Sequence, residues 1–113
     1  MNNLKTFNFP IEATISLIGG KYKAIILFHL INKTLRFNEL QKLIPQATPK
    51  MLTQQLRQLE GNGIIVRIAY AVVPPKTEYS LSQFGKSIVP IINAMCDWGT
   101  IYLDKSDTQN DLL

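Results

Sequence analysis

A chain of 113 residues is long enough for one compact domain and too short for two with independent cores, so we expect a single domain over residues 1–113, with a core at about 9–103 and flexible ends. Apolar residues make up 46% of the chain and charged residues 18%, which excludes general disorder. The formal net charge of +4 is uneven, because residues 36–76 carry six basic and two acidic side chains whereas the segment from Asp97 onward is acidic. This distribution favours a polyanionic partner for the basic part of the molecule.

Membrane, metal and catalytic functions have little support in the sequence. The apolar stretches, such as residues 24–31, are far shorter than the about 20 residues that span a bilayer, and no secretion signal opens the chain, so we expect a cytoplasmic protein with no membrane partner. One cysteine, Cys96, and one histidine, His29, are too few for a tetrahedral zinc site, so we expect no metal and no cofactor. His29 has no nucleophile or paired carboxylate nearby in the sequence, so we assign no catalytic residue and disfavour an enzyme.

Helical signals dominate the first half of the chain. Proline at the first position and a Gly-Gly pair after the last predict a helix over residues 10–18. A second helix is predicted over residues 21–31 and a short strand over residues 35–37. A third helix, over residues 38–43, is expected to turn Leu43 inward together with its apolar neighbours.

The helix predicted over residues 49–62 has the clearest boundaries. Thr48 is a good N-cap, Pro49 a good first residue, and a Gly-Asn-Gly sequence ends the helix. At about 100° per residue, its three leucines fall on one side and define the buried face. The opposite face carries Lys50, Thr53, Gln54 and Arg57.

This polar face is suited to reading duplex DNA. Lysine and arginine bind phosphate or guanine, glutamine pairs with adenine through two hydrogen bonds, and threonine offers a hydroxyl and a methyl group to base edges. On this helix alone, an ordinary solvated face remains the alternative.

A β-hairpin and a last helix follow. Residues 64–73 and 77–81 are rich in β-branched and apolar residues, and a proline pair at the expected tip stands beside Lys76. A final helix is predicted over residues 84–103, where Pro90 either kinks it or delays its regular part.

Two short helices followed at once by a hairpin predict a winged helix-turn-helix, of mainly α class with a small antiparallel β-hairpin (α+β). We therefore expect a sequence-specific transcriptional regulator, with residues 49–62 in the major groove of duplex DNA and the wing, residues 64–81, on the flanking backbone. The alternative is a winged-helix module that binds protein, for which an apolar or acidic recognition face would be the sign. We assign DNA contact to Arg36, Lys42, Thr48, Pro49, Lys50, Thr53, Gln54, Arg57 and Lys76.

The final helix has more apolar surface than one core needs. Two neighbouring apolar rows cover about half of its circumference, whereas packing on one core needs a stripe of about 100°. The first row is residues 84, 88, 91, 95, 98 and 102, and the second is residues 89, 92, 96, 99 and 103. The simplest partner is a second copy of the chain, because a two-fold axis places two recognition helices about 34 Å apart. The alternative is that the first helix covers the second row within one chain. Cys96 lies in that row and is expected to be buried and structural. We assign the dimer interface to Ile11, Ile15, Ile88, Ile91, Ile92, Met95, Trp98 and Tyr102.

Five motifs occur in a fixed order along the chain. They are residues 18–23 (IGGKYK), 35–40 (LRFNEL), 51–60 (MLTQQLRQLE), 73–81 (VPPKTEYSL) and 96–99 (CDWG). Together they resemble the HxlR-type winged helix-turn-helix regulators, a MarR-like group, over residues 9–103. The resemblance implies a homodimer assembled through the first and last helices.

Many members of this group carry a cysteine immediately before the proline that opens the first helix, and in some this thiol senses oxidants. Phe9 occupies that position here, so the resemblance does not extend to thiol sensing at this site. A small-molecule effector is compatible with the group, but no residue identifies one.

Overall fold

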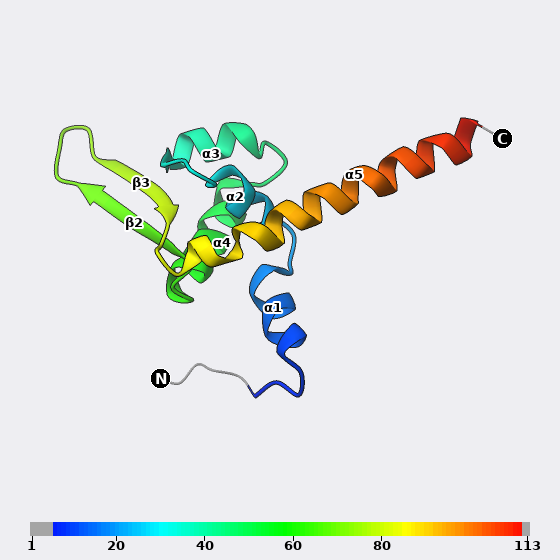
Figure 1. Cartoon of the computed structure of the whole chain (residues 1–113). Helices are drawn as coiled ribbons and strands as arrows, with labels where there is room; N and C mark the ends of the chain where they lie inside the picture. The colour runs from blue at the N-terminus through cyan, green and yellow to red at the C-terminus, as the bar shows by residue number, and fades with distance from the viewer. Residues whose placement is uncertain (1–5, 112–113) are drawn as a thin grey trace.

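The computed structural model describes the backbone of residues 6–111 and the side chains of residues 6–106. Helices and a small antiparallel sheet form one body, from which the last helix projects (Figure 1). This content confirms the predicted mainly α class with a small β element. The elements in chain order are α1 (Pro10–Ile18), α2 (Lys23–His29), β1 (Leu35–Arg36), α3 (Phe37–Leu43), α4 (Pro49–Gly61), β2 (Ile65–Tyr70), β3 (Lys76–Leu81), the 3-10 helix η1 (Gly85–Ile88) and α5 (Val89–Asp111).

The second helix is shorter than predicted. It covers Lys23–His29 instead of residues 21–31. Tyr22 (φ −128°, ψ −5°) and Leu30 (φ −90°, ψ 0°) depart from helical geometry at its two ends, and Gly20 and Asn32 beyond them have positive φ. At the C-terminal end the apolar residues continue through Leu30 and Ile31, so apolar periodicity alone overestimated the length there.

The last helix is longer than predicted. α5 continues to Asp111, past the expected end near residue 103. Its regular part begins only after η1, which confirms that Pro90 delays the helix. Pro90 lies at the second residue of α5, where an amide N–H has no partner within the helix, so the missing donor costs little.

The sheet has the strand order β1-β3-β2, and both strand pairs are antiparallel. The register pairs Ile65 with Leu81 at one end of the hairpin and Tyr70 with Lys76 at the other. Ile65, Tyr79 and Leu81 belong to the face that is buried in the core. Side chains alternate between the two faces of a strand, so the opposite face carries Val66, Ile68, Tyr70 and Glu78.

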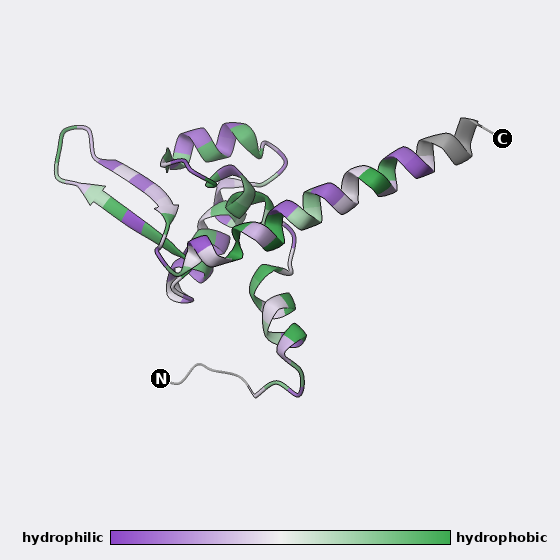
Figure 2. Cartoon of the chain, viewed as in Figure 1, coloured by the Kyte–Doolittle hydropathy of each residue, from purple (hydrophilic) through white to green (hydrophobic). Residues whose placement is uncertain are grey.

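The core joins all the helices of the body to the sheet. Leu43, which we expected to face inward, is exposed, because Leu40 and Ile44 occupy the buried side of α3. Hydrophobic segments gather where the helices meet (Figure 2). The largest fully buried side chains are Ile26, Leu27, Leu30, Leu40, Ile44, Leu52, Leu56, Leu59, Ile65 and Ile92.

Two residues that we assigned to a dimer interface belong instead to this core. Ile88 is 8% exposed and Ile92 is 2% exposed within a single chain. Ile92 faces α2, where Ala24 and Phe28 line the same hollow. The prediction did not consider that the same chain could bury these two positions, and it is corrected for both.

Beyond its first turns, α5 projects from the body into solvent (Figure 1). Leu103, on the same row as Ile92, is therefore exposed. Cys96 is also exposed, so the expectation of a buried, structural cysteine is wrong for the single chain. No helix within residues 6–111 combines the length and the apolar character that a bilayer span requires.

Candidate nucleic-acid interface

The polar face of α4 points outward because its other face is anchored in the core. Leu52, Leu56 and Leu59 are each no more than 1% exposed. The helix starts as predicted, since the Thr48 hydroxyl accepts a hydrogen bond of 3.1 Å from the backbone N–H of Met51. Opposite the leucines, three side chains are exposed and one is half-buried. These are Lys50, Gln54 and Arg57, and Thr53, respectively.

The turn that leads into α4 is held by two side chains that sequence reasoning missed. The Gln41 side-chain amide donates a hydrogen bond of 2.6 Å to the Ala47 carbonyl. The Tyr22 hydroxyl, whose ring is buried, donates one of 3.1 Å to the Gln46 carbonyl. Because both bonds end just before Thr48, they fix the direction in which α4 presents its polar face. In the sequence, the signal for this contact is the tyrosine within the glycine- and lysine-rich motif of residues 18–23.

The segment before α2 brings a further cation to the side of α4. A side chain built at Gly20 would come within 3.7 Å of Oε1 of Gln55, so this segment lies against α4. The next residue, Lys21, is exposed, and its Nζ lies 5.6 Å from the centre of the Tyr22 ring. Our prediction of DNA-contacting residues considers basic side chains only within residues 36–76, so it does not include Lys21.

The cation expected at the wing tip lies elsewhere and is largely neutralised. Lys76 is the first residue of β3, and its Nζ lies 3.4 Å from a carboxylate oxygen of Glu78 and 4.9 Å from the centre of the Tyr70 ring. The Tyr70 hydroxyl donates a hydrogen bond of 2.9 Å to Glu78 and, with Lys76, lowers the pKa of that carboxyl group. The tip itself, residues 71–75, is apolar, and Val73 is fully exposed.

Replacing Glu78 with glutamine should strengthen binding to duplex DNA of random sequence. The change removes the charge that compensates Lys76, so we expect the salt dependence of binding to steepen by about one unit. Fluorescence anisotropy titrations over a range of salt concentrations measure both quantities. Asp97→Asn, which removes one acid from exposed α5, is the matched control. An equal gain in both variants would reduce the effect to net charge and contradict a specific role for Glu78.

The remaining predicted cations are exposed but lie on other elements. Arg36 ends β1 and precedes α3, where its backbone N–H donates a hydrogen bond of 2.7 Å to Glu39. Lys42 lies in the last turn of α3. Arg67, on β2, pairs with Glu60 at 3.5 Å and so ties the wing to the end of α4.

An apolar surface remains exposed on the two terminal helices. On α1 it includes Ile11 and Ile15. On α5 the rings of Trp98 and Tyr102 stack with their centres 5.4 Å apart, and Trp98 is 64% exposed. The prediction missed Ile101, which is equally exposed. Ile91 and Met95 continue this surface toward the body.

His29 lies at the end of α2 with its ring edge against Phe28, at a centre-to-centre distance of 5.2 Å. Partial burial and, to a smaller extent, the nearby Lys33 lower the pKa of His29. A neutral histidine at a core boundary fits the structural role that the sequence suggested for it.

The model of the HxlR-like helix-turn-helix family matches residues 17–107, which include every element from α2 to most of α5. The chain belongs to this family. The HxlR-like chain is 53% identical over 98 residues to YdeP of Bacillus subtilis, an uncharacterized HTH-type transcriptional regulator, and the match covers 87% of this chain and 77% of YdeP. It is 48% identical over 101 residues to the B. subtilis regulator YtcD, covering 89% and 80% of the two chains.

Solved structures of HxlR-like and MarR-type regulators share the fold. The crystal structure of the HTH-type regulator YtcD aligns with a TM-score of 0.80 at 48% identity, and the alignment covers 85% of this chain and 98% of that one. The reduced form of the redox regulator HypR aligns with a TM-score of 0.84 at 45% identity and covers 88% and 99%. These comparisons confirm the predicted family and the winged-helix fold, and they identify the chain as a transcriptional regulator of the helix-turn-helix type.

Proposed function

We propose that this HxlR-like protein binds duplex DNA sequence-specifically as a homodimer, with α4 in the major groove and the β2–β3 hairpin on the flanking backbone. The outward polar face of α4 is the observation that carries the proposal. It presents two cations, an amide and a hydroxyl, and the first acidic residue of the helix, Glu60, pairs with Arg67. A major groove accepts such a face because its base edges and phosphates provide hydrogen-bond acceptors and negative charge.

The contacts divide by position. Thr53, Gln54 and Arg57 lie along the middle of α4 and are assigned to base edges. Contact with the sugar-phosphate backbone is assigned to Arg36, Lys42, Thr48, Pro49, Lys50 and Lys76.

Lys21 joins the set that binds the backbone, because its segment lies against α4. Lys21→Ala should weaken binding to specific and random duplexes alike, and should lower the salt dependence by about one unit. Lys105→Ala, which removes a cation from the projecting part of α5, should leave both unchanged. An unaltered salt dependence in Lys21→Ala would exclude this lysine from the interface.

The homodimer explains the apolar surface of α1 and α5. A second copy related by a two-fold axis would cover Trp98 and Tyr102, and it would bring two α4 helices to one face of the assembly. Exposed apolar patches of this kind mark interaction sites in soluble proteins.

A protein-binding module is the second candidate, because one observation favours it. The free face of the sheet exposes Val66 and Ile68, and the wing tip exposes Val72 and Val73. Surfaces of this composition bind proteins more often than phosphates.

Selection of bound duplexes from a random pool tests the proposal. We expect an inverted repeat whose half-sites lie about 34 Å apart, one turn of the double helix. A pool that stays random after repeated selection would reject sequence-specific binding and favour the protein-binding candidate.

A further inference from the structure

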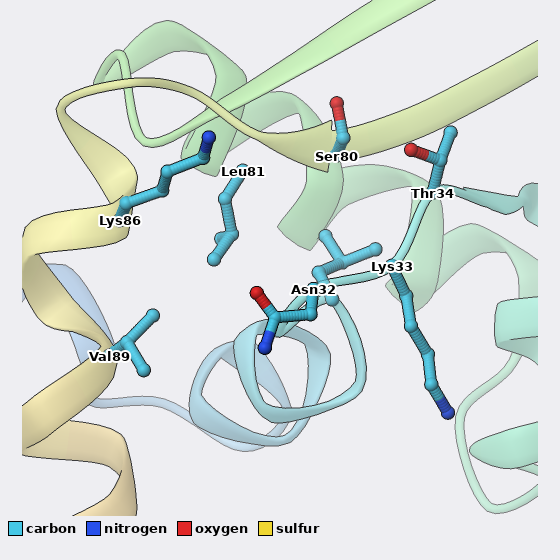
Figure 3. Close-up of a pocket in the computed structure, with 8 residues that line it drawn as sticks. Asn32, Lys33, Thr34, Ser80, Leu81, Lys86 and Val89 are labelled. Atoms are coloured by element: carbon cyan, nitrogen blue, oxygen red, sulfur yellow. The ribbon is translucent and has the colours of Figure 1, made fainter.

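The outer strand of the wing has an open edge. β2 lies at one side of the sheet, and β3 separates it from β1. Within the described residues, no backbone hydrogen bond outside the sheet involves residues 66–70. The other side of the sheet adjoins the body: β1 leads directly into α3, and Ser80 of β3 lines a hollow with Asn32 and Thr34 from the turn after α2 (Figure 3). A further strand could therefore be added beside β2.

The alternation of hydrogen bonds shows which backbone groups of β2 point outward. The Ile64 carbonyl accepts a hydrogen bond of 2.9 Å from the Ser82 N–H, in register with the strand pairs that follow. In an antiparallel pair, every second residue exchanges hydrogen bonds with the neighbouring strand. The even-numbered residues of β2 therefore direct their N–H and C=O groups toward β3, whereas Arg67 and Ala69 direct theirs away from the sheet.

The side chains of β2 do not protect this edge. Edge strands of soluble proteins normally carry charges, a proline or a bulge that prevents pairing with another chain. β2 has no proline, its register with β3 is continuous, and its one charged residue, Arg67, is engaged by Glu60 at 3.5 Å. On the free face, Val66, Ile68 and Tyr70 are exposed. An edge of this composition is typical of a strand that pairs with another chain.

The sequence of β2 is complementary to itself in one antiparallel register. A two-fold axis at Ile68 sets this residue opposite its own copy and Val66 opposite Tyr70, so apolar side chains meet along one face. Arg67 then lies opposite Ala69, and these are the residues whose backbone groups point outward. An axis at Arg67 would instead set two arginines opposite each other, which destabilises a strand pair.

We propose that the β2 strands of two copies pair antiparallel about Ile68 and join two wings into one continuous sheet. This contact is separate from the apolar surface of the terminal helices, because the wing and the projecting part of α5 extend from different sides of the body (Figure 1). Only residues 66–70 of each copy take part. This is far less surface than a stable dimer buries, so the contact should dissociate at micromolar concentration.

The wing contact would connect dimers to one another. A dimer assembled through α1 and α5 carries two wings, so the contact continues from one dimer to the next. Dimers held on neighbouring DNA sites are at high local concentration, which makes a weak contact effective. We therefore expect adjacent sites to fill cooperatively, and this consequence alone rests on the proposed function.

Disulfide trapping tests the register. Ile68→Cys is made in the full chain together with Cys96→Ser, which removes the exposed native thiol. Opposite residues of a non-hydrogen-bonded pair have Cα atoms about 4.5 Å apart, a distance that a disulfide spans. At roughly millimolar chain concentration, oxidised glutathione should therefore produce covalent pairs that are visible on a non-reducing gel.

Ala69→Cys in the same background is the matched control. In the proposed register, residue 69 and its copy are diagonal neighbours about 7–8 Å apart, farther than a disulfide spans without backbone movement. This variant should form few covalent pairs. The proposal is overturned if Ile68→Cys gives no covalent pairs or if both variants cross-link equally.

Ile68→Lys tests the contact without cross-linking. Two lysines would lie directly opposite each other and should raise the dissociation constant of the wing contact at least about tenfold. Sedimentation equilibrium at roughly millimolar concentration measures this constant. Val73→Lys adds the same charge to a fully exposed residue outside β2 and should associate like the parent chain. An equal loss in both variants would assign the effect to net charge and reject the strand pairing.

Trp98→Asp separates the wing contact from the proposed homodimer. Trapping through Ile68→Cys should end at covalent pairs when Trp98→Asp is also present, and should give larger assemblies when the tryptophan is retained. Covalent pairs in both cases would refute the homodimer through α5 and leave the wing contact standing. None of these measurements uses DNA, so a chain that pairs through β2 but selects no duplex would refute the proposed function alone.

Discussion

Trp98→Asp should convert the protein from dimers to monomers at micromolar concentration. The carboxylate would lie within the apolar surface that the second copy covers, where no cation is assigned to pair with it. Burial of an unpaired charge should raise the dissociation constant of the dimer at least a hundredfold, or about 3 kcal/mol. Sedimentation equilibrium measures the constant directly, and circular dichroism checks that the monomer remains folded.

The control for this substitution is Asn93→Asp, which adds the same charge to an exposed position elsewhere on α5. It should leave the dimer intact. If Trp98→Asp sediments as a stable dimer, then α5 does not form the interface at this residue, and the apolar surface must have another partner.

Arg57→Ala should weaken binding to the selected operator by about 1–3 kcal/mol, because the arginine would lose its hydrogen bonds to a base edge. The loss should be much smaller on random duplex, and repeated selection with the variant should relax the preference at one position of each half-site. Anisotropy titrations on both duplexes give the two affinities at one salt concentration.

The control is Lys105→Ala, which removes an exposed charge from α5, the helix that projects from the body (Figure 1). It should preserve both affinities. Equal losses on operator and random DNA would reassign Arg57 to a phosphate, and an unchanged affinity would place the outer face of α4 outside the groove.

The sequence was sufficient to predict α4 because local chemistry determines both its ends and its faces. Thr48 and Pro49 start the helix, and the leucine spacing leaves only one side for the core. The wing was harder to predict. Its strands follow from composition, but the pairing of Lys76 with Glu78 depends on strand register and on Tyr70, and these become visible only when the sheet is formed.

The residues assigned to the dimer interface show a second limit of prediction from the sequence. Apolar spacing identified the two rows of α5 correctly, but it could not show which row meets the same chain. Ile92 is covered by α2, and the contact between these two helices, which are distant in the chain, does not follow from the residue spacing of either one.

The two hydrogen bonds that Tyr22 and Gln41 make to the turn before α4 have a thermodynamic consequence. Because these bonds fix the direction of α4 when the domain folds, little further ordering of the helix is required when the protein binds a partner. The heat-capacity change of association should then reflect the contact area alone, without the larger negative value that accompanies coupled folding.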